Sequence, residues 1–239
     1  MGPGVRLIPV EGIGEVRPGD DLAALLADAI AAGPGLEAGD VVVVTHKVVS
    51  KAEGSVVDLD DDGPDAHRAL VESEATAVLR RRGDLVIART RHGFICANAG
   101  VDRSNVEAGR AVLLPRDPDR SAHGLRRRLV GRFGTDVAVI VSDTFGRPWR
   151  RGLVDVAIGM SGLAAIDDHR GRTDTHGNVL EVTEVAVADE LAAAADLVMG
   201  KASGIPAAIV RGVAVPPGTG RAVDLVRTDD EARFPAARS

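Results

Sequence analysis

DVAVIVSDTFGRPWRRG, residues 136–152, joins an apolar run to a polar and cationic end. Residues 137–141 are all apolar and mostly β-branched, which is typical of a strand buried on both faces. Asp143 and Thr144 follow almost at once, and then a glycine, a proline, the only Trp of the chain and three arginines. We therefore predict a rigid strand that carries an acid and a hydroxyl at its end, where the chain turns away.

Similar apolar runs elsewhere predict a chain that mixes strands with helices. Residues 41–45, VVVVT, are a second buried strand, and Asp20 or Asp21 is an N-cap candidate for a helix through Ile30. Further strands are expected at 5–10, 85–88, 94–97, 111–114, 154–160 and 206–211, and further helices at 66–82, 118–133 and 183–198, the last with Asp189, Glu190 and Asp196 facing outward. Because no strict βαβ alternation is visible, we predict an α+β fold with mixed sheets and packed helices. One domain is expected over residues 1–215, with an irregular tail over 216–239.

Composition and charge exclude several classes of protein. The 239 residues carry a formal net charge of −6, which argues against a sequence-independent nucleic-acid binder. The arginines at 126–128 and 132 favour a solvated helix face over a nucleic-acid surface. Cys96 is the only cysteine, which suits a reducing cytoplasm, and no apolar run approaches the roughly 18 residues that span a membrane.

The common motifs for nucleotide binding and for nucleophilic catalysis are incomplete or absent. Gly12-Ile13-Gly14 lacks the third glycine of a Rossmann fingerprint, because Arg17 stands there. Gly200-Lys201 resembles the end of a P-loop, but Ala195 replaces the required glycine. We therefore expect neither a Rossmann nor a P-loop core. The chain also has no paired Cys, no H-E-x-x-H and no G-x-S-x-G.

Three polar segments at strand ends carry the candidate chemistry. Residues 45–54 place Lys47 and Lys51 four positions apart, so that a helical turn would put both cations on one face. Residues 98–105 contain Asp102 and Asn105, and residues 142–144 contain Asp143 and Thr144. Carboxylate, amide and hydroxyl oxygens suit Mg²⁺ or Mn²⁺, and lysines suit phosphates, so together the segments predict a metal–phosphate site.

Each segment also has a purely structural interpretation. The two lysines fit surface positions, Asp102 and Asn105 fit a turn, and Asp143 fits a helix N-cap. Trp149 either stacks on a ligand ring or packs against the core, and packing is favoured.

The chain resembles the coenzyme F420:L-glutamate ligases over nearly its whole length. The matching segments are VEGIGEVRPGDD, GDVVVVTHKVVSKAEG, NAGVDRSNVEAG, LLPRDPDRSA, VSDTFGRPWRRG, VDVAIGMSGL, GNVLEVTEVAVADELAAAADLVMGK and IPAAIVRG, in order from residue 10 to 212. They look especially like the ligase portion of actinobacterial bifunctional proteins, whose additional flavin-type domain is not expected within these 239 residues.

The resemblance implies an irregular α+β fold, usually homodimeric, with γ-glutamyl ligase activity in the domain at 1–215. It implies that the carboxylate of coenzyme F420-0 takes the γ-phosphate of GTP and that L-glutamate then displaces phosphate, with Mg²⁺ or Mn²⁺ as cofactor. It leaves open whether a monovalent cation such as K⁺ takes part. A phosphorylated carboxylate is a far better acyl donor than a free one, which agrees with the residue types found.

Site residues follow from the matched positions. The resemblance implies Asp102, Asp143 and Thr144 as divalent-metal ligands, and Asp143 and Lys51 as catalytic residues. It implies GTP contacts at Gly12, Ile13, Gly14, Glu15, His46, Lys47, Lys51 and Asn105, although other members often carry small hydroxyl residues at positions 46 and 47. The loop 200–204 matches a further nucleotide and metal loop of the family, but it is short here. Lys201 and Ser203 replace the acidic or Gly-rich turn expected there, and no metal ligand is assigned in it.

Two other functions stay open at this point. A γ-glutamyl ligase acting on another carboxylate, such as a folate, would use the same activation chemistry. A module that binds a nucleotide or deazaflavin without catalysis would use the same pocket without turnover.

Overall fold

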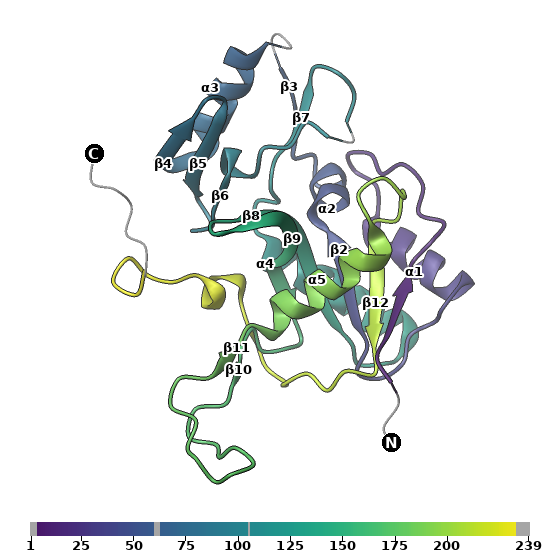
Figure 1. Cartoon of the computed structure of the whole chain (residues 1–239). Helices are drawn as coiled ribbons and strands as arrows, with labels where there is room; N and C mark the ends of the chain where they lie inside the picture. The colour runs from purple at the N-terminus through teal and green to yellow at the C-terminus, as the bar shows by residue number, and fades with distance from the viewer. Residues whose placement is uncertain (1–3, 60–62, 105, 233–239) are drawn as a thin grey trace.

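The computed structural model of the chain describes residues 4–59, 63–104 and 106–232. A five-stranded mixed sheet in the order β1-β12-β2-β8-β9 forms the centre of the main body (Figure 1). Strands β2 and β8 are parallel, and all other neighbours in this sheet are antiparallel. The bounds are β1 (Arg6–Pro9), β12 (Ala207–Arg211), β2 (Val41–Thr45), β8 (Ala138–Arg147) and β9 (Arg150–Ser161).

Helices cover both faces of this sheet. One face packs against α1 (Leu22–Ala32), α2 (His46–Ala52) and α4 (Pro118–Phe133), and the other against α5 (Val187–Met199). Alternation along β2 explains its all-valine run: Val42 and Val44 face the first set of helices, while Val41 and Val43 face α5. All four valines are fully buried, so the prediction of a strand buried on both faces is confirmed.

A smaller lobe lies beside the main sheet, at the upper left of Figure 1. Its core is a small apolar cluster that includes Val71, Val86 and Val101. The lobe consists of a β4-β5-β6 sheet, a β3-β7 pair, α3 and the short helix η1. Their bounds are β3 (Val56–Asp58), α3 (Pro64–Glu74), β4 (Ala75–Arg82), β5 (Leu85–Thr90), β6 (Ile95–Ala97), η1 (Asn98–Gly100) and β7 (Arg110–Val112).

The helix predicted over 66–82 is wrong in its second half. The helix α3 ends at Glu74, and residues 75–82 form β4, which pairs antiparallel with β5. Gly83, at φ 59°, allows the tight turn between the two strands. Pairing with β5 satisfies the backbone of this exposed segment, whose sequence alone favours a helix only weakly.

The helix predicted at 183–198 begins later, at Val187, because Glu184–Val185 is strand β11, paired with β10 (Asp167–Asp168). The outward orientation predicted for Asp189 is also wrong, whereas Glu190 is exposed as predicted. Asp189 accepts a hydrogen bond from the Ala157 backbone at 2.9 Å, and Asp196 accepts one from Lys201. Burial raises the pKa of Asp189 above its ordinary value.

The β8–β9 hairpin differs from the prediction in two ways. Strand β8 continues through Arg147 and turns at Pro148 and Trp149, so Asp143 lies within a strand and not at a helix N-cap. Trp149 is 75% exposed, so the favoured packing against the core is wrong.

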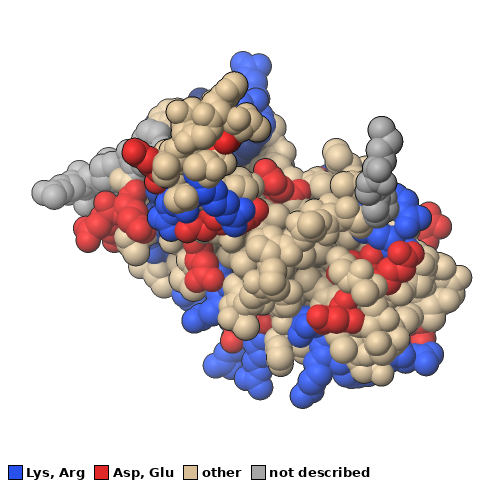
Figure 2. Space-filling view, turned by 90° about the horizontal axis from the view of Figure 1, so that it is seen from below, with Lys and Arg blue, Asp and Glu red and all other residues tan. Residues whose placement is uncertain are grey.

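Figure 2 shows basic and acidic side chains interspersed over the face seen there. Residues 216–232 include the short helix η2 (Ala222–Leu225), whose Ala222 is buried. Within the described residues, none of the helices is long and apolar enough to span a membrane. The α+β fold with mixed sheets is confirmed.

Candidate active site

The candidate site begins where the two parallel strands separate. Strands β2 and β8 pair from Val41 with Ala138 up to Thr45 with Ser142. Immediately afterwards β2 turns into α2, while β8 continues with Asp143 and Thr144, paired only with β9. The end of a parallel strand pair is a common place for a ligand, because the diverging chains leave a crevice there.

A cavity of about 1330 Å³ opens at this point. Residues from all three predicted polar segments and from the first glycine loop line it: Ile13, Gly14, Glu15, Lys47, Lys51, Asp102, Asp143 and Thr144. Of the other predicted site residues, Gly12 lies in the same loop without lining the cavity, and Asn105 lies outside the described residues.

His46 lies behind the cavity and not in its wall. Its side chain is 1% exposed, and its Nε2 is 3.1 Å from Oδ1 of Asp143. The same carboxylate oxygen accepts a hydrogen bond from the Thr144 backbone at 2.7 Å. His46 thus packs against the Asp143 carboxylate from the core side, and the Asp143 side chain keeps 13% of its surface exposed.

The two lysines of α2 each bind an acid across the cavity. Lys47 Nζ is 2.8 Å from Asp102 Oδ2 and donates to Ser104 Oγ at 2.6 Å. Burial alone would raise the pKa of Asp102, but the bonds from Lys47 and from the Ser104 backbone hold that pKa below its ordinary value. Lys51 Nζ donates to Glu15 Oε1 at 2.6 Å, and Glu15 is 70% exposed. An anionic ligand could therefore replace Glu15 as the partner of Lys51 at little cost.

Four further polar residues line the same cavity without having been predicted as site residues: Ser104, Asp155, Asp196 and Lys201, of which only Lys201 lies in a loop that the resemblance pointed to. Asp155 is the most informative, since it stands in the apolar strand segment Val154–Ile158 and is 3% exposed. An acid within a buried strand needs a partner, because an unpaired buried charge is costly. That pattern was visible in the sequence, whereas the partners, which come from distant segments, were not.

The donor atoms of the cavity suit a divalent cation in kind. Among the described residues, no three His, Cys, Asp or Glu side chains gather closely enough to hold an ion by themselves. Mg²⁺ is commonly held by one or two carboxylates together with water and substrate phosphates, so a full protein cage is not required. Asp102 and Asp143 supply two carboxylates of this kind, and Thr144 adds a hydroxyl oxygen.

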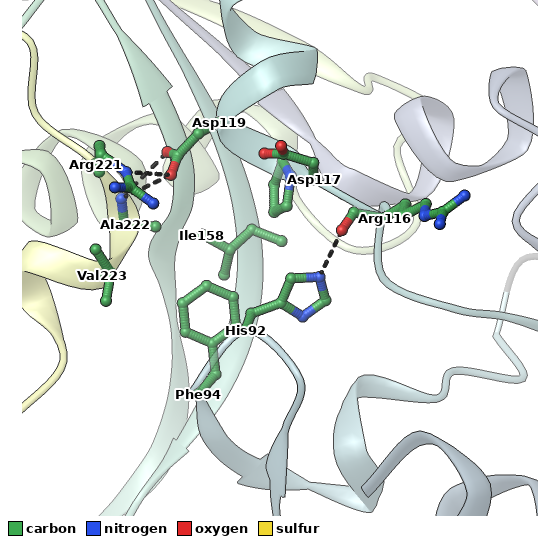
Figure 3. A pocket seen from close by; sticks show the side chains of 10 residues that line it. His92, Phe94, Arg116, Asp117, Asp119, Ile158, Arg221, Ala222 and Val223 are labelled. Carbon is green, nitrogen blue, oxygen red and sulfur yellow. Dashed lines mark hydrogen bonds and ion pairs between the residues drawn. The ribbon is translucent and has the colours of Figure 1, made fainter. Parts of the chain in front are cut away.

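A smaller cavity of about 200 Å³ lies apart from these residues, between the small lobe, the start of α4 and η2 (Figure 3). Its polar groups mostly bind the backbone around them. His92 Nε2 is 2.9 Å from the Pro115 carbonyl, and Asp119 accepts hydrogen bonds from the Met160 and Ala222 amides. These contacts join elements of the fold, so the larger cavity is the better candidate for chemistry.

Comparison with known proteins places the chain among ligases. It belongs to the F420-0:gamma-glutamyl ligase family, whose profile matches residues 12–212. The coenzyme F420:L-glutamate ligase of Methanothermobacter thermautotrophicus is 48% identical over 87% of this chain and 89% of its own length. The ligase of the same name from Methanopyrus kandleri is 47% identical over 88% of each chain, and that of Archaeoglobus fulgidus is 41% identical over 95% of each.

These relatives are archaeal, and the alignments span most of their lengths. They do not support the special likeness to actinobacterial bifunctional proteins that the sequence suggested. The predicted family is confirmed.

Proposed function

We propose that this chain is a GTP-dependent coenzyme F420:L-glutamate ligase. The F420-0 carboxylate oxygen attacks the γ-phosphorus of GTP, and GDP leaves. The amine of L-glutamate then attacks the carbonyl carbon of the acyl phosphate, and phosphate leaves as the nitrogen loses a proton. Repetition on the γ-carboxylate of the added glutamate extends the chain.

The observation that carries the proposal is the mixture of charges in one cavity. Lys47, Lys51, Asp102 and Asp143 come from separate segments and line the same space. Phosphoryl transfer needs mainly positioning and charge neutralisation. The family to which the chain belongs, together with the names of its relatives, supports the choice of substrates.

The side chains have separate tasks in this scheme. The loop Gly12–Glu15 and Lys51 receive the phosphates of GTP, with Lys51 exchanging Glu15 for phosphate oxygens. Asp102, Asp143 and Thr144 would hold Mg²⁺ or Mn²⁺, which when bound neutralises charge on the transferred phosphate. His46, packed behind the Asp143 carboxylate, would limit the orientations open to it.

The acceptor lies on the side of the β8–β9 hairpin. Arg147, Arg150 and Arg151 cluster there, and their charge suits the anionic groups of the deazaflavin tail. Leu153 is 69% exposed and also lines the cavity, so a second copy of the chain covering the exposed hairpin would help to close the site. We propose a homodimer, which light scattering would test, and a cytoplasmic location.

The test is turnover with defined substrates. The purified chain should release phosphate from GTP only when both F420-0 and L-glutamate are present, and mass spectrometry should find γ-glutamyl products. Mg²⁺ and Mn²⁺ are each assayed with and without K⁺, and a folate replaces F420-0 in a parallel reaction. Product with the folate alone would identify the other acceptor. GTP binding without product under any of these conditions would indicate a non-catalytic module.

Asp143→Ala tests the site itself. Turnover should fall by at least about 10²-fold, since the variant loses a charged group at the transferred phosphate. The variant should keep its circular dichroism spectrum, because Asp143 is partly exposed and lies outside the apolar core. Unchanged turnover would remove Asp143 from the catalytic residues.

A further inference from the structure

The ammonium group of Lys201 lies among three oxygens of the candidate site. Its Nζ donates to Thr144 Oγ1 at 2.5 Å, to Asp155 Oδ1 at 2.8 Å and to Asp196 Oδ1 at 2.9 Å. We call these three oxygens the oxygen cage. An ammonium group has three N–H donors, so this arrangement uses all of them.

The cage is built on regular elements. Thr144 on β8 and Asp155 on β9 are direct partners in the antiparallel register, and Asp196 lies on α5. The Thr144 hydroxyl donates in turn to Asp155 Oδ1 at 2.6 Å, and the other oxygen of Asp155 accepts from Ser142 Oγ at 2.9 Å. Both oxygens of this buried carboxylate are therefore fixed before any ligand arrives.

Lys201 reaches the cage from just beyond the end of α5. Gly200, the C-cap residue, has φ 62°, which turns the chain so that the lysine side chain comes back over Asp196. Burial alone would lower the pKa of Lys201, but the bonds with Asp155 and Asp196 raise that pKa above its ordinary value. The lysine therefore carries a full positive charge at neutral pH.

We propose that Lys201 is a built-in cation of the active site, occupying a position where a divalent ion would otherwise bind. Two carboxylate oxygens and a hydroxyl are hard ligands of the kind that Mg²⁺ and Mn²⁺ select. Thr144 belongs both to the cage and to the cavity wall beside Asp143, so the ammonium charge lies next to the site of chemistry. Any role of Lys201 towards substrate phosphate rests on the proposed function, whereas the position of Lys201 in the oxygen cage does not.

Lys201 should keep a divalent metal ion from binding the carboxylates of the oxygen cage. With Lys201 present, the carboxylate oxygens of Asp155 and Asp196 already have a cation, and a metal ion would have to displace a tethered partner to bind them. The Thr144 hydroxyl accepts only one hydrogen bond in the cage, so its second lone pair stays available to an ion beside Asp143. Once the ammonium is removed, Asp155 and Asp196 face each other without a counter-charge, which favours capture of a divalent ion.

The experiment counts bound Mn²⁺ without substrates, using the electron paramagnetic resonance signal of the free ion. Lys201→Ala should bind about one more Mn²⁺ per chain than the parent. Lys201→Arg, which keeps the charge, should bind as the parent does. Lys201→Ala combined with Asp155→Asn should lose the added site. Because the Lys201 side chain is 56% exposed, we expect its replacement to leave the fold intact, which circular dichroism would check.

Equal Mn²⁺ counts for the parent and Lys201→Ala would overturn the proposal, as would an added site that persists when Asp155 is also replaced. If Lys201→Ala does not fold, Lys201→Gln gives the same comparison without the charge. Because no substrate is present, the Mn²⁺ count tests this proposal independently of the ligase proposal. If the parent shows no ligase activity but Lys201→Ala binds an added ion, the cage proposal is supported. If the parent is an active ligase but Lys201→Ala binds no added ion, the cage proposal is refuted.

Discussion

The ion pair between Asp40 and Arg211 should be among the most costly polar contacts to break. Arg211 donates from Nε to Asp40 Oδ1 at 2.8 Å and from Nη2 to Oδ2 at 2.7 Å, and the two residues are 7% and 1% exposed. The pair joins the end of β12 to the start of β2, the central strands that hold the site. Arg211→Met leaves the Asp40 carboxylate buried without its cation.

Removing one partner of a buried pair typically costs about 3–5 kcal/mol. The Glu37 amide still donates to Asp40 Oδ2 at 2.8 Å, which supports part of the charge, so we expect the lower end, about 3 kcal/mol. For a chain of this length that corresponds to a fall in melting temperature of roughly 6–12 °C. Urea denaturation followed by circular dichroism measures the free energy of unfolding directly.

A matched control is the Arg170–Asp168 pair, which has the same 2.7 Å contact but side chains that are 51% and 47% exposed. Arg170→Met should change the free energy of unfolding little, because water and salt screen this pair. Adding Asp40→Asn to Arg211→Met should recover part of the lost stability, since the variant then buries no charge. A cost below about 1 kcal/mol for Arg211→Met, or a double variant less stable than the single one, would refute the reasoning.

Two further predictions concern stability and reactivity. Gly159→Ala should destabilise the fold by about 1–3 kcal/mol in urea denaturation, because the added Cβ would lie 2.4 Å from the Pro118 carbonyl group. Gly131→Ala serves as the control, since a Cβ there meets nothing within 4 Å. Equal effects of the two substitutions would contradict this prediction. Burial raises the pKa of Cys96 to about 12, so iodoacetamide at pH 8 should label the folded chain far more slowly than the unfolded chain, and comparable rates would exclude a buried thiol. An ordinary thiol has a pKa of 9.0, whereas the pKa of Cys96 in the folded chain is about 12. The folded chain therefore keeps a proton that the unfolded chain loses, and the free energy of unfolding should fall as the pH rises from 9.0 to about 12.

The sequence predicted the central sheet well because its strands are short apolar runs with no competing interpretation. Residues 41–45 and 137–141 can only be buried, and β2 and β8 are indeed parallel neighbours at the centre. The segment 75–82 was harder, because its sequence does not distinguish a helix from a strand. Its conformation is decided by β5, a partner that becomes visible only when the chain has folded.

The candidate site, too, could be predicted from the sequence only in part. Lys47, Asp102 and Asp143 come after predicted strands, so their segments could be expected to converge, and they line one cavity. The position of His46 could not be expected, because nothing in Thr45-His46-Lys47 indicates which side chain enters the cavity and which packs behind it. The helical period of α2 decides that: Lys47 and Lys51, four residues apart, share the cavity face, and His46 points back into the core beside β8.

Charge balance connects these observations. Several acids border the cavity, and three of them, Glu15, Asp102 and Asp155, bind its lysines. Each of the three is paired with a lysine, Lys51, Lys47 and Lys201 respectively. The acids fix the lysines in place, which would reduce the side-chain entropy lost on binding the phosphate that we propose, and the exposed Glu15 could yield its lysine to that ligand. The buried Asp155 cannot yield in this way, because its carboxylate would be left without a counter-charge. Lys51 is therefore the lysine suited to a substrate that enters and leaves, and Lys201 the one suited to a permanent charge.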